Sequence, residues 1–473
     1  MQTARILSVA LALAVAGCDM APDYTPPKIA VPVSYKEVGP WSPATPADDV
    51  QRGAWWSIFP DPILDGLEQR IEKNSPRLAA AVARYDQARG LAGQARSSLF
   101  PSLDLETSAE RDRLSANRPL QTKPAVYNDY VGGLAASYEL DLWGRVRNLV
   151  AQGDADEQAS AADLASVHLS LQAELADDYL RLRGLDAEMA LLSDTVDAFD
   201  KALKLTVTLH SGGASSAIDV GRAETQLASA KAQLSDVGAD RALLEHAIAS
   251  LVGEPASTFS IAPAVQTIVI PLVPVTAPSL LLQRRPDIAA AERRVAAANA
   301  GIGVQRAAFY PDITLGLSGG FESVRGNLLS APSAFWALGP AVAVLSIFDG
   351  GERTAALKVA HGQFDEAAAN YRQTVLDSFR EVEDEMALAN RLAEEAKHQD
   401  DSVAAASRTN KLAFVQYKEG AADYLGVVTA QTAELQAEMA ALNVQTRRQQ
   451  AAIALVRALG GGWEQNGPKL ADR

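Results

Sequence analysis

The sequence is poor in the residue types on which enzyme and metal sites depend. It holds a single cysteine, Cys18, so no disulfide can form within the chain. Its five histidines are scattered along the predicted helices, and none is paired with another at the spacing of a metal site. No glycine-rich phosphate loop is present. We therefore predict no enzyme activity, no catalytic residue, no cofactor and no metal.

Long apolar runs, basic charge and central prolines are also lacking. Outside the N-terminus no apolar run reaches the roughly 18 residues of a membrane-spanning helix. The net charge of -15 argues against a nucleic-acid partner, which needs a basic surface. Proline is absent from residues 126 to 254, and aromatic residues make up only 6% of the chain. This composition favours long, closely packed helices.

The N-terminus has the pattern of an export signal over residues 1–17. Arg5 supplies a positive charge, and Ile6–Ala16 is an apolar core. Small residues then lead into Cys18, which resembles a bacterial lipobox and predicts Cys18 as the lipid attachment site. The alternative is an ordinary secretory signal with an incidental cysteine. Asp19 follows directly, and in enteric bacteria an aspartate there tends to retain a lipoprotein at the inner membrane. Residues 18–54 are proline-rich and predict an extended strap.

One stretch, from Gly144 to Leu209, predicts a single helix of roughly 100 Å at about 1.5 Å per residue. Its apolar residues recur every 3.5 residues on average, which is typical of a coiled coil. This seam comprises Leu182, Leu185, Met189, Leu192, Val196, Phe199 and Leu203. A break at Gly212-Gly213 and a return helix over about 218–251 complete a helical hairpin.

Before this helix the apolar period changes from helix-like to strand-like. Residues from Pro101 to about Glu110, and again from Tyr130 to Leu142, alternate between apolar and polar side chains. Strands of this length with one apolar and one acidic face suit a transmembrane β-barrel. The alternative is a solvent-facing hairpin. A loop is expected between the strands, up to about Asn128.

The chain then repeats itself. Pro286 and Pro311 correspond to Pro76 and Pro101, each 210 positions later in the sequence. Two further strands are expected over about 313–322 and 335–348, a second long helix over 351–418 and a return helix from Tyr424. We therefore assign residues 55–253 and 279–462 to two repeats, 254–278 to a linker that has room for a short strand or two, and 463–473 to a tail.

The strand count predicts the assembly. Four strands cannot close a membrane barrel, which needs at least about eight, and open edges are not tolerated in lipid. A homotrimer would supply twelve strands and twelve coiled helices. The predicted fold class is mixed α and β, mainly α, with a two-fold internal repeat. It forms a trimeric 12-stranded transmembrane β-barrel continued by a long periplasmic α-helical coiled-coil barrel.

The sequence resembles the outer-membrane efflux proteins, the TolC-like outer-membrane factors, and especially their NodT-type lipoprotein branch. The motifs that carry the resemblance are Leu281–Ile288, Ala291-Glu292, Ala297–Ala300, Ile302-Gly303, Tyr310-Pro311, Trp55-Trp56, Phe59–Pro62, Leu140–Arg145, Tyr417, Gly420 and Tyr424-Leu425. The resemblance implies a passive exit duct in the outer membrane, lipid-anchored and with a large periplasmic portion. It also implies a periplasmic adaptor, an inner-membrane transporter, often of the RND type, and drugs or other small molecules as cargo. The alternatives are a duct for type I protein secretion and, less in keeping with the strands, a periplasmic coiled-coil adaptor.

The resemblance also assigns roles to the two helical turns. Gly213, Ser216 and Asp219 in the first turn, with Gly420 in the second, match the tips where adaptor hairpins dock. Asp219 equally suits a plain helix cap. Asp423, Tyr424, Leu425 and Thr429 match the segment that narrows the periplasmic aperture. Many relatives carry a carboxylate where this chain has Thr429, so Tyr424 and Leu425 are expected to close the pore sterically. Arg285-Pro286-Asp287 is expected to be structural.

Overall fold

The computed structural model describes residues 19–32, 34–37, 54–115, 125–265, 270, 271, 273 and 284–461. The predicted signal peptide, Cys18 and the C-terminal tail lie outside the described residues, as do most of the strap after Glu37 and much of the linker. Among the helices described, none is both long and apolar enough to cross a membrane. The chain folds into two compact units. The first comprises Met1–Lys28, Arg84–Ala161 and Ala290–Arg372; the second comprises Ile29–Ala83, Ala162–Ala289 and Gln373–Arg473.

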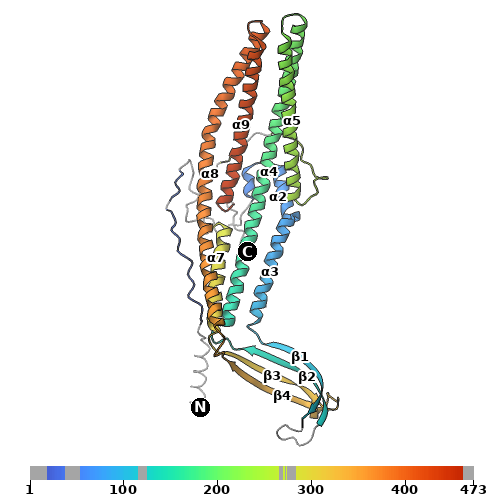
Figure 1. The fold of residues 1–473 in the computed structure, drawn as a ribbon, viewed down its shortest axis with the longest axis vertical. Coiled ribbons are helices and arrows are strands. Elements are labelled where there is room, and N and C mark those ends of the chain that lie inside the picture. Colours follow the sequence, from blue (N-terminus) through green and yellow to red (C-terminus); the bar gives the residue numbers. More distant parts are fainter. Residues whose placement is uncertain are drawn as a thin grey trace, which may run out of the picture. The chain divides into compact units, whose positions relative to one another are not determined.

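The first unit contains a four-stranded antiparallel sheet, with strands in the order β1-β2-β3-β4 (Figure 1). The strands are β1 (Ser102–Leu114), β2 (Ala125–Glu139), β3 (Asp312–Ser323) and β4 (Ala334–Val344). A short 3-10 helix, η2 (Ala331–Ser333), precedes β4. Strands from the two sequence repeats therefore meet at the β2–β3 pair, and β1 and β4 are the sheet's edges.

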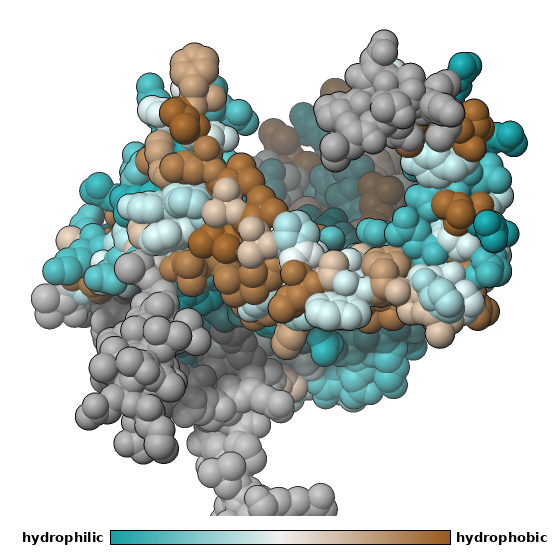
Figure 2. All heavy atoms as spheres, turned by 90° about the horizontal axis from the view of Figure 1, so that it is seen from below, coloured by the Kyte–Doolittle hydropathy of each residue, from teal (hydrophilic) through white to brown (hydrophobic). Residues whose placement is uncertain are grey.

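The sheet has two chemically different faces. The register places Leu105 beside Leu134, Leu134 beside Gly319, and Gly319 beside Trp336, so these residues share one face. The exposed apolar residues of that face include Leu103, Leu105, Leu134, Leu315, Leu317, Trp336 and Leu338. Along β1 the opposite face is acidic, with Asp104, Glu106, Glu110 and Asp112. Figure 2 shows hydrophobic residues running as a band between hydrophilic ones on the side seen from below.

The strand ends differ from the prediction. β2 begins at Ala125, within the expected loop, and ends at Glu139, before the expected Leu142. The earlier end has a local cause: the Asp141 carboxylate accepts hydrogen bonds from the backbone N–H groups of Val146 (3.0 Å) and Arg147 (2.9 Å), so Asp141 belongs to the start of the next helix. β4 likewise stops at Val344, short of the expected Phe348.

The helices occur as matched pairs, which confirms the two-fold repeat of the fold. Helices α3 (Pro76–Ser97) and α7 (Pro286–Ala307) each have 22 residues. The long helices α4 (Arg145–Ser211) and α8 (Glu352–Lys418) each have 67. The return helices α5 (Ala217–Leu251) and α9 (Tyr424–Ala458) each have 35. Two short elements, η1 (Trp55–Ile58) and α2 (Pro62–Asn74), complete the described set.

The second unit contains a large apolar core, and the predicted seam of α4 lies within this unit. Leu182, Leu192 and Phe199 are buried. Leu192 packs with Val237 of α5 and Leu435 of α9, while Phe199 packs with α5. Figure 1 shows α4 antiparallel to α5, and α8 antiparallel to α9. Apolar burial along these seams stabilises each hairpin at roughly 25 cal/mol per Å² removed from water.

A buried ionic network ties α4 and α5 to the start of the linker. The Asp186 carboxylate accepts from Arg183 Nη1 (2.8 Å), Arg241 Nε (2.6 Å) and the backbone N–H of Ala264 (3.0 Å). Arg183 also donates to the Ala262 carbonyl at 2.9 Å. The described residues 255–265 contain no strand, and the rest of the linker, where the sequence has room for a short strand or two, lies largely outside the described residues. Their backbone groups bond to charged side chains of the helices instead of to a second strand.

Candidate functional site

The first helical turn is closed by a Schellman motif around Gly213. The Ala214 N–H donates to the Leu209 carbonyl (2.8 Å) and the Gly213 N–H to the His210 carbonyl (2.9 Å). Gly213 has φ 77°, a left-handed conformation that favours glycine. The turn therefore has one defined shape rather than a freely varying loop.

Asp219 forms a capping box with Ser216 at the start of α5. The Asp219 N–H donates to Ser216 Oγ (3.2 Å), and Ser216 N–H donates back to Asp219 Oδ2 (3.1 Å). Partial burial raises the pKa of Asp219, but hydrogen bonds from Ser216 and Ser215 and the charge of Arg222 outweigh it and hold the pKa below its usual range. Asp219 is thus a charged cap, and any docking surface here is shaped by it.

The second turn uses the same geometry. The Ala421 N–H donates to the Gln416 carbonyl (2.8 Å) and the Gly420 N–H to the Tyr417 carbonyl (3.0 Å), with Gly420 at φ 73°. Asp423 is the N-cap of α9, and its carboxylate accepts from the Gly426 N–H at 3.2 Å. The two turns are therefore structural counterparts.

The predicted aperture residues divide into a buried one and exposed ones. The Tyr424 side chain is only 2% exposed, and its ring lies 5.1 Å from that of Tyr417. The Tyr424 ring therefore packs inward within the protomer, and its role at the aperture stays a prediction. Leu425 is 46% exposed, and Asp423 and Thr429 are exposed too. The Thr429 hydroxyl donates to the Leu425 carbonyl at 2.9 Å, one turn back.

Side chains from all four hairpin helices meet beneath these turns. Tyr417 and Tyr424 cluster with Ala223 and Val427, and with Leu203, Leu205, Leu209, Phe414 and Val428 around them. Gln226 of α5 donates to Thr432 Oγ1 of α9 at 3.4 Å. Sequence reasoning missed Gln226, because a polar residue on a helix surface carries no signal of a partner 206 positions away.

A groove of about 490 Å³ lies next to this cluster between α5 and α9. It is lined by Ile218, Gly221, Arg222, Thr225, Gln226, Ser229, Val428 and Thr432. Ile218, in the first turn of α5, is 66% exposed. The groove therefore offers an apolar residue beside a fixed charged cap.

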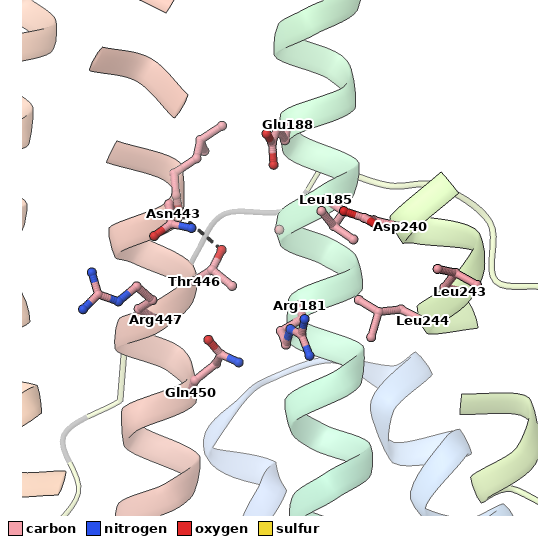
Figure 3. Close-up of a pocket in the computed structure, with 12 residues that line it drawn as sticks. Arg181, Leu185, Glu188, Asp240, Leu243, Leu244, Asn443, Thr446, Arg447 and Gln450 are labelled. Carbon is pink, nitrogen blue, oxygen red and sulfur yellow. Dashed lines mark hydrogen bonds between the residues drawn. The ribbon is translucent and has the colours of Figure 1, made fainter. Parts of the chain in front are cut away.

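A second groove, of about 550 Å³, lies farther along the hairpins between α4, α5 and α9. The helices α4 and α9 approach closely there, because a Cβ on Gly184 would lie 2.5 Å from Thr446 Oγ1. Figure 3 shows Arg181 and Arg447 at one level and Glu188 toward the other end. Burial, and then the charge of Asp240, raise the pKa of Glu188.

The motif Arg285-Pro286-Asp287 is a structural cross-link, as its local sequence suggested. Arg285 donates to Asp287 (2.7 Å), to Glu381 of α8 (2.7 Å) and to the Ala458 carbonyl of α9 (2.9 Å). The arginine is 8% exposed, so these partners compensate a buried charge. Its place is the junction of α7, α8 and α9.

A two-faced antiparallel sheet and paired hairpins of very long helices define the class of outer-membrane channel proteins. Comparison with known proteins agrees. The family described as outer membrane efflux protein matches residues 67–254 and 277–461. The chain belongs to this family, and it is an outer-membrane efflux protein.

Relatives and solved structures match over nearly the whole chain. It is 31% identical to the probable efflux pump outer membrane protein TtgC of Pseudomonas putida, covering 98% of this chain and 97% of TtgC. It is 31% identical to the pyoverdine export outer membrane protein OpmQ of Pseudomonas aeruginosa, covering 100% and 99%. The open-state MtrE outer membrane channel of Neisseria gonorrhoeae aligns with a TM-score of 0.84 and 28% identity, covering 96% and 100%.

Proposed function

We propose that the protein is the passive exit duct of a tripartite pump that exports drugs or other small molecules. The observation that carries this proposal is the open four-stranded sheet with two different faces. One face is apolar and exposed on β1 to β4, and the opposite face is acidic along β1. Three copies would pair their edge strands into a twelve-stranded barrel with the apolar face toward lipid. Cys18, once acylated, would add a lipid anchor.

The proposed partners are an adaptor that contacts the turns of the helical hairpins and a transporter in the inner membrane. A periplasmic adaptor would dock at the turns that contain Gly213, Ser216, Asp219 and Gly420, and an inner-membrane transporter of the RND type would supply the energy. The support for docking is the groove beside the first turn, where exposed Ile218 lies next to the Asp219 cap. Channel opening would involve the exposed aperture residues Asp423, Leu425 and Thr429.

Deletion of the gene followed by a broad toxin-susceptibility screen tests the exit-duct function. We expect the deletion strain to become at least several-fold more susceptible to a set of small toxic compounds, with resistance restored by the wild-type gene. Loss of a secreted protein with unchanged susceptibility would contradict export of small molecules and favour a protein-secretion duct. A monomeric protein without β-structure by circular dichroism would contradict the channel itself.

A charge placed in the groove at the first turn tests adaptor docking. Ile218→Asp would put a carboxylate where an apolar contact is needed, and the like charge of Asp219 lies one residue away. We expect it to lose at least tenfold in restored resistance while trimer yield stays unchanged. Leu243→Asp is the matched control, since Leu243 also lies on α5 and is equally exposed at 66%. Equal loss in both variants would contradict docking at the groove.

A further inference from the structure

Three residues of α7 form a polar stripe at intervals of seven: Glu292, Asn299 and Arg306. Seven residues are close to two helical turns, so the three side chains lie on one face. Glu292 and Asn299 belong to the motifs that carry the family resemblance, yet the proposed exit-duct function assigns them no role. Together with Gly303 on the same helix, they contact the chain's own N-terminal segment.

The N-terminal segment Asp19–Tyr24 crosses this stripe in one register. Arg306 Nη1 donates to the Met20 carbonyl (3.4 Å), and Asn299 Nδ2 donates to the Pro22 carbonyl (2.8 Å). The Tyr24 hydroxyl donates to Glu292 Oε1 at 2.5 Å. Successive contacts lie two residues apart along the segment and seven residues apart along α7. The segment and the helix run in opposite directions. Alternate residues of an extended chain present similar groups to the same side, which explains the step of two.

A close approach between the segment and the helix depends on Gly303. A Cβ at this position would lie 2.8 Å from the Ala21 Cβ and 2.6 Å from Asn148 Nδ2. Asn148, in the first turn of α4, is buried and donates to Asp19 Oδ1 at 2.8 Å. The Asp19 carboxylate also accepts from the Ala21 N–H at 3.0 Å. The Asp19–Ala21 end of the segment is therefore fixed by buried and closely packed groups.

We propose that the α7 stripe, Gly303 and Asn148 form a seat that recognises the chain's own N-terminal segment in a single register. Asp19 is a positioning residue of this seat, because its carboxylate is held by Asn148. The seat tethers Asp19 to the start of α4, within the unit that contains the sheet. The consequence for membrane anchoring rests on the acylation of Cys18 proposed above, whereas recognition of the segment does not.

Limited trypsin digestion of the purified mature protein in detergent tests the seat. Lys28 is exposed just beyond the contact, so cleavage there reports how often the segment detaches. Asn299→Ala removes the donor to Pro22, and Asn148→Ala removes the donor to Asp19. We expect each to raise the cleavage rate about fivefold, since one hydrogen bond contributes roughly 1 kcal/mol. Gln305→Ala, on the same helix and with no hydrogen bond to the segment, should leave the rate unchanged.

A size swap makes the test independent of lost hydrogen bonds. Gly303→Ala improves helix propensity, but its Cβ would meet the Ala21 Cβ and the Asn148 amide, so we expect faster cleavage. Ala21→Gly in the same chain should return part of the protection. The seat is refuted if Asn299→Ala, Asn148→Ala and Gly303→Ala all cleave at the rate of Gln305→Ala, or if the rates rise only when the melting temperature falls.

A Cys18→Ser variant, exported with an ordinary cleavable leader, separates the effect of the lipid from the effect of the seat. We expect this chain to show the same protection at Lys28 and the same loss in Asn299→Ala. Protection that disappears in Cys18→Ser would show that the lipid, not the seat, holds the segment. Neither result depends on efflux, so failure of the seat and failure of the exit-duct function are distinguishable.

Discussion

At the scale of single residues, a few buried polar groups decide how this helical protein is held together. Asp186 accepts from two arginines while it is 4% exposed, and Arg285 links three helices from a similarly buried position. In both cases the charge is compensated by several partners at once. Removing one partner would leave a buried charge uncompensated, which typically costs about 3–5 kcal/mol.

Glu68 is the exception, since it is buried without such partners. It lies on α2 with 0% exposure, and among the described residues neither carboxyl oxygen has a hydrogen-bond partner. Burial, together with the charges of Glu72 and Asp65, raises the pKa of Glu68 to about 9. The carboxyl group is therefore protonated in the folded protein at neutral pH, whereas it is ionised in the unfolded chain.

This difference gives stability a definite dependence on pH. Because the folded protein binds the Glu68 proton more tightly than the unfolded chain, stability falls as pH rises from the ordinary value of 4.5 to about 9. Glu68→Gln mimics the protonated group and removes this slope. We expect the variant to be more stable by on the order of 5 kcal/mol at pH 8 and nearly equal in stability at pH 4.5. Thermal melting at both pH values measures this, and a constant difference between the variants would contradict it.

Residue-scale contacts were the least predictable part of the structure from the sequence. Tyr424 was expected at the aperture, but its burial against Tyr417 depends on how two hairpins pack. The contact of Asn299 with Pro22 joins residues 277 positions apart and involves a backbone carbonyl, which no side-chain pattern encodes. The helix cap at Asp219, in contrast, is a local contact and follows from the sequence.

At the scale of elements, the sequence predicted helices better than strands. The heptad seam of α4 is repeated many times, so an error at one position does not change the period. Its predicted end near Leu209 lies two residues from the observed Ser211. The strands are short, and their ends depend on local competition: the Asp141 carboxylate bonds to the first turn of α4, and β2 ends before this residue. Alternation still predicted which side chains share a face.

The two faces of β3 give a matched test of membrane insertion. Leu317 and Ser318 are neighbours on opposite faces, with Leu317 on the apolar face and 51% exposed. A lysine on a lipid-facing strand position costs roughly 2–4 kcal/mol near the bilayer centre, whereas a lumen position tolerates charge. We therefore expect Leu317→Lys to lose most heat-stable trimer in outer-membrane fractions, and Ser318→Lys to keep it. Equal trimer yields in the two variants would mean that the apolar face does not contact lipid.

At the scale of the whole molecule, an exit duct built from three copies repeats every residue around one axis. A single substitution at a constriction therefore adds three charges at once, whereas the same substitution elsewhere adds three distant ones. Thr429 is exposed at the predicted aperture, and its hydroxyl already bonds to the carbonyl one turn back, so the position tolerates a polar side chain. The charges nearest to it in sequence are Glu434 and the Asp423 cap, one on each side.

Thr429→Asp should therefore add a ring of three carboxylates at the constriction. Facing carboxylates bind multivalent cations strongly, so we expect block of single-channel current in planar bilayers at roughly tenfold lower divalent-cation concentration than for wild type. Thr409→Asp is the control, because Thr409 lies on α8 outside the aperture segment and makes the same backbone contact, to Ala405 at 2.9 Å. If Thr429→Asp and Thr409→Asp are blocked alike, Thr429 does not line the constriction. Since that outcome leaves conductance intact, it would relocate the aperture along α9 without contradicting the channel.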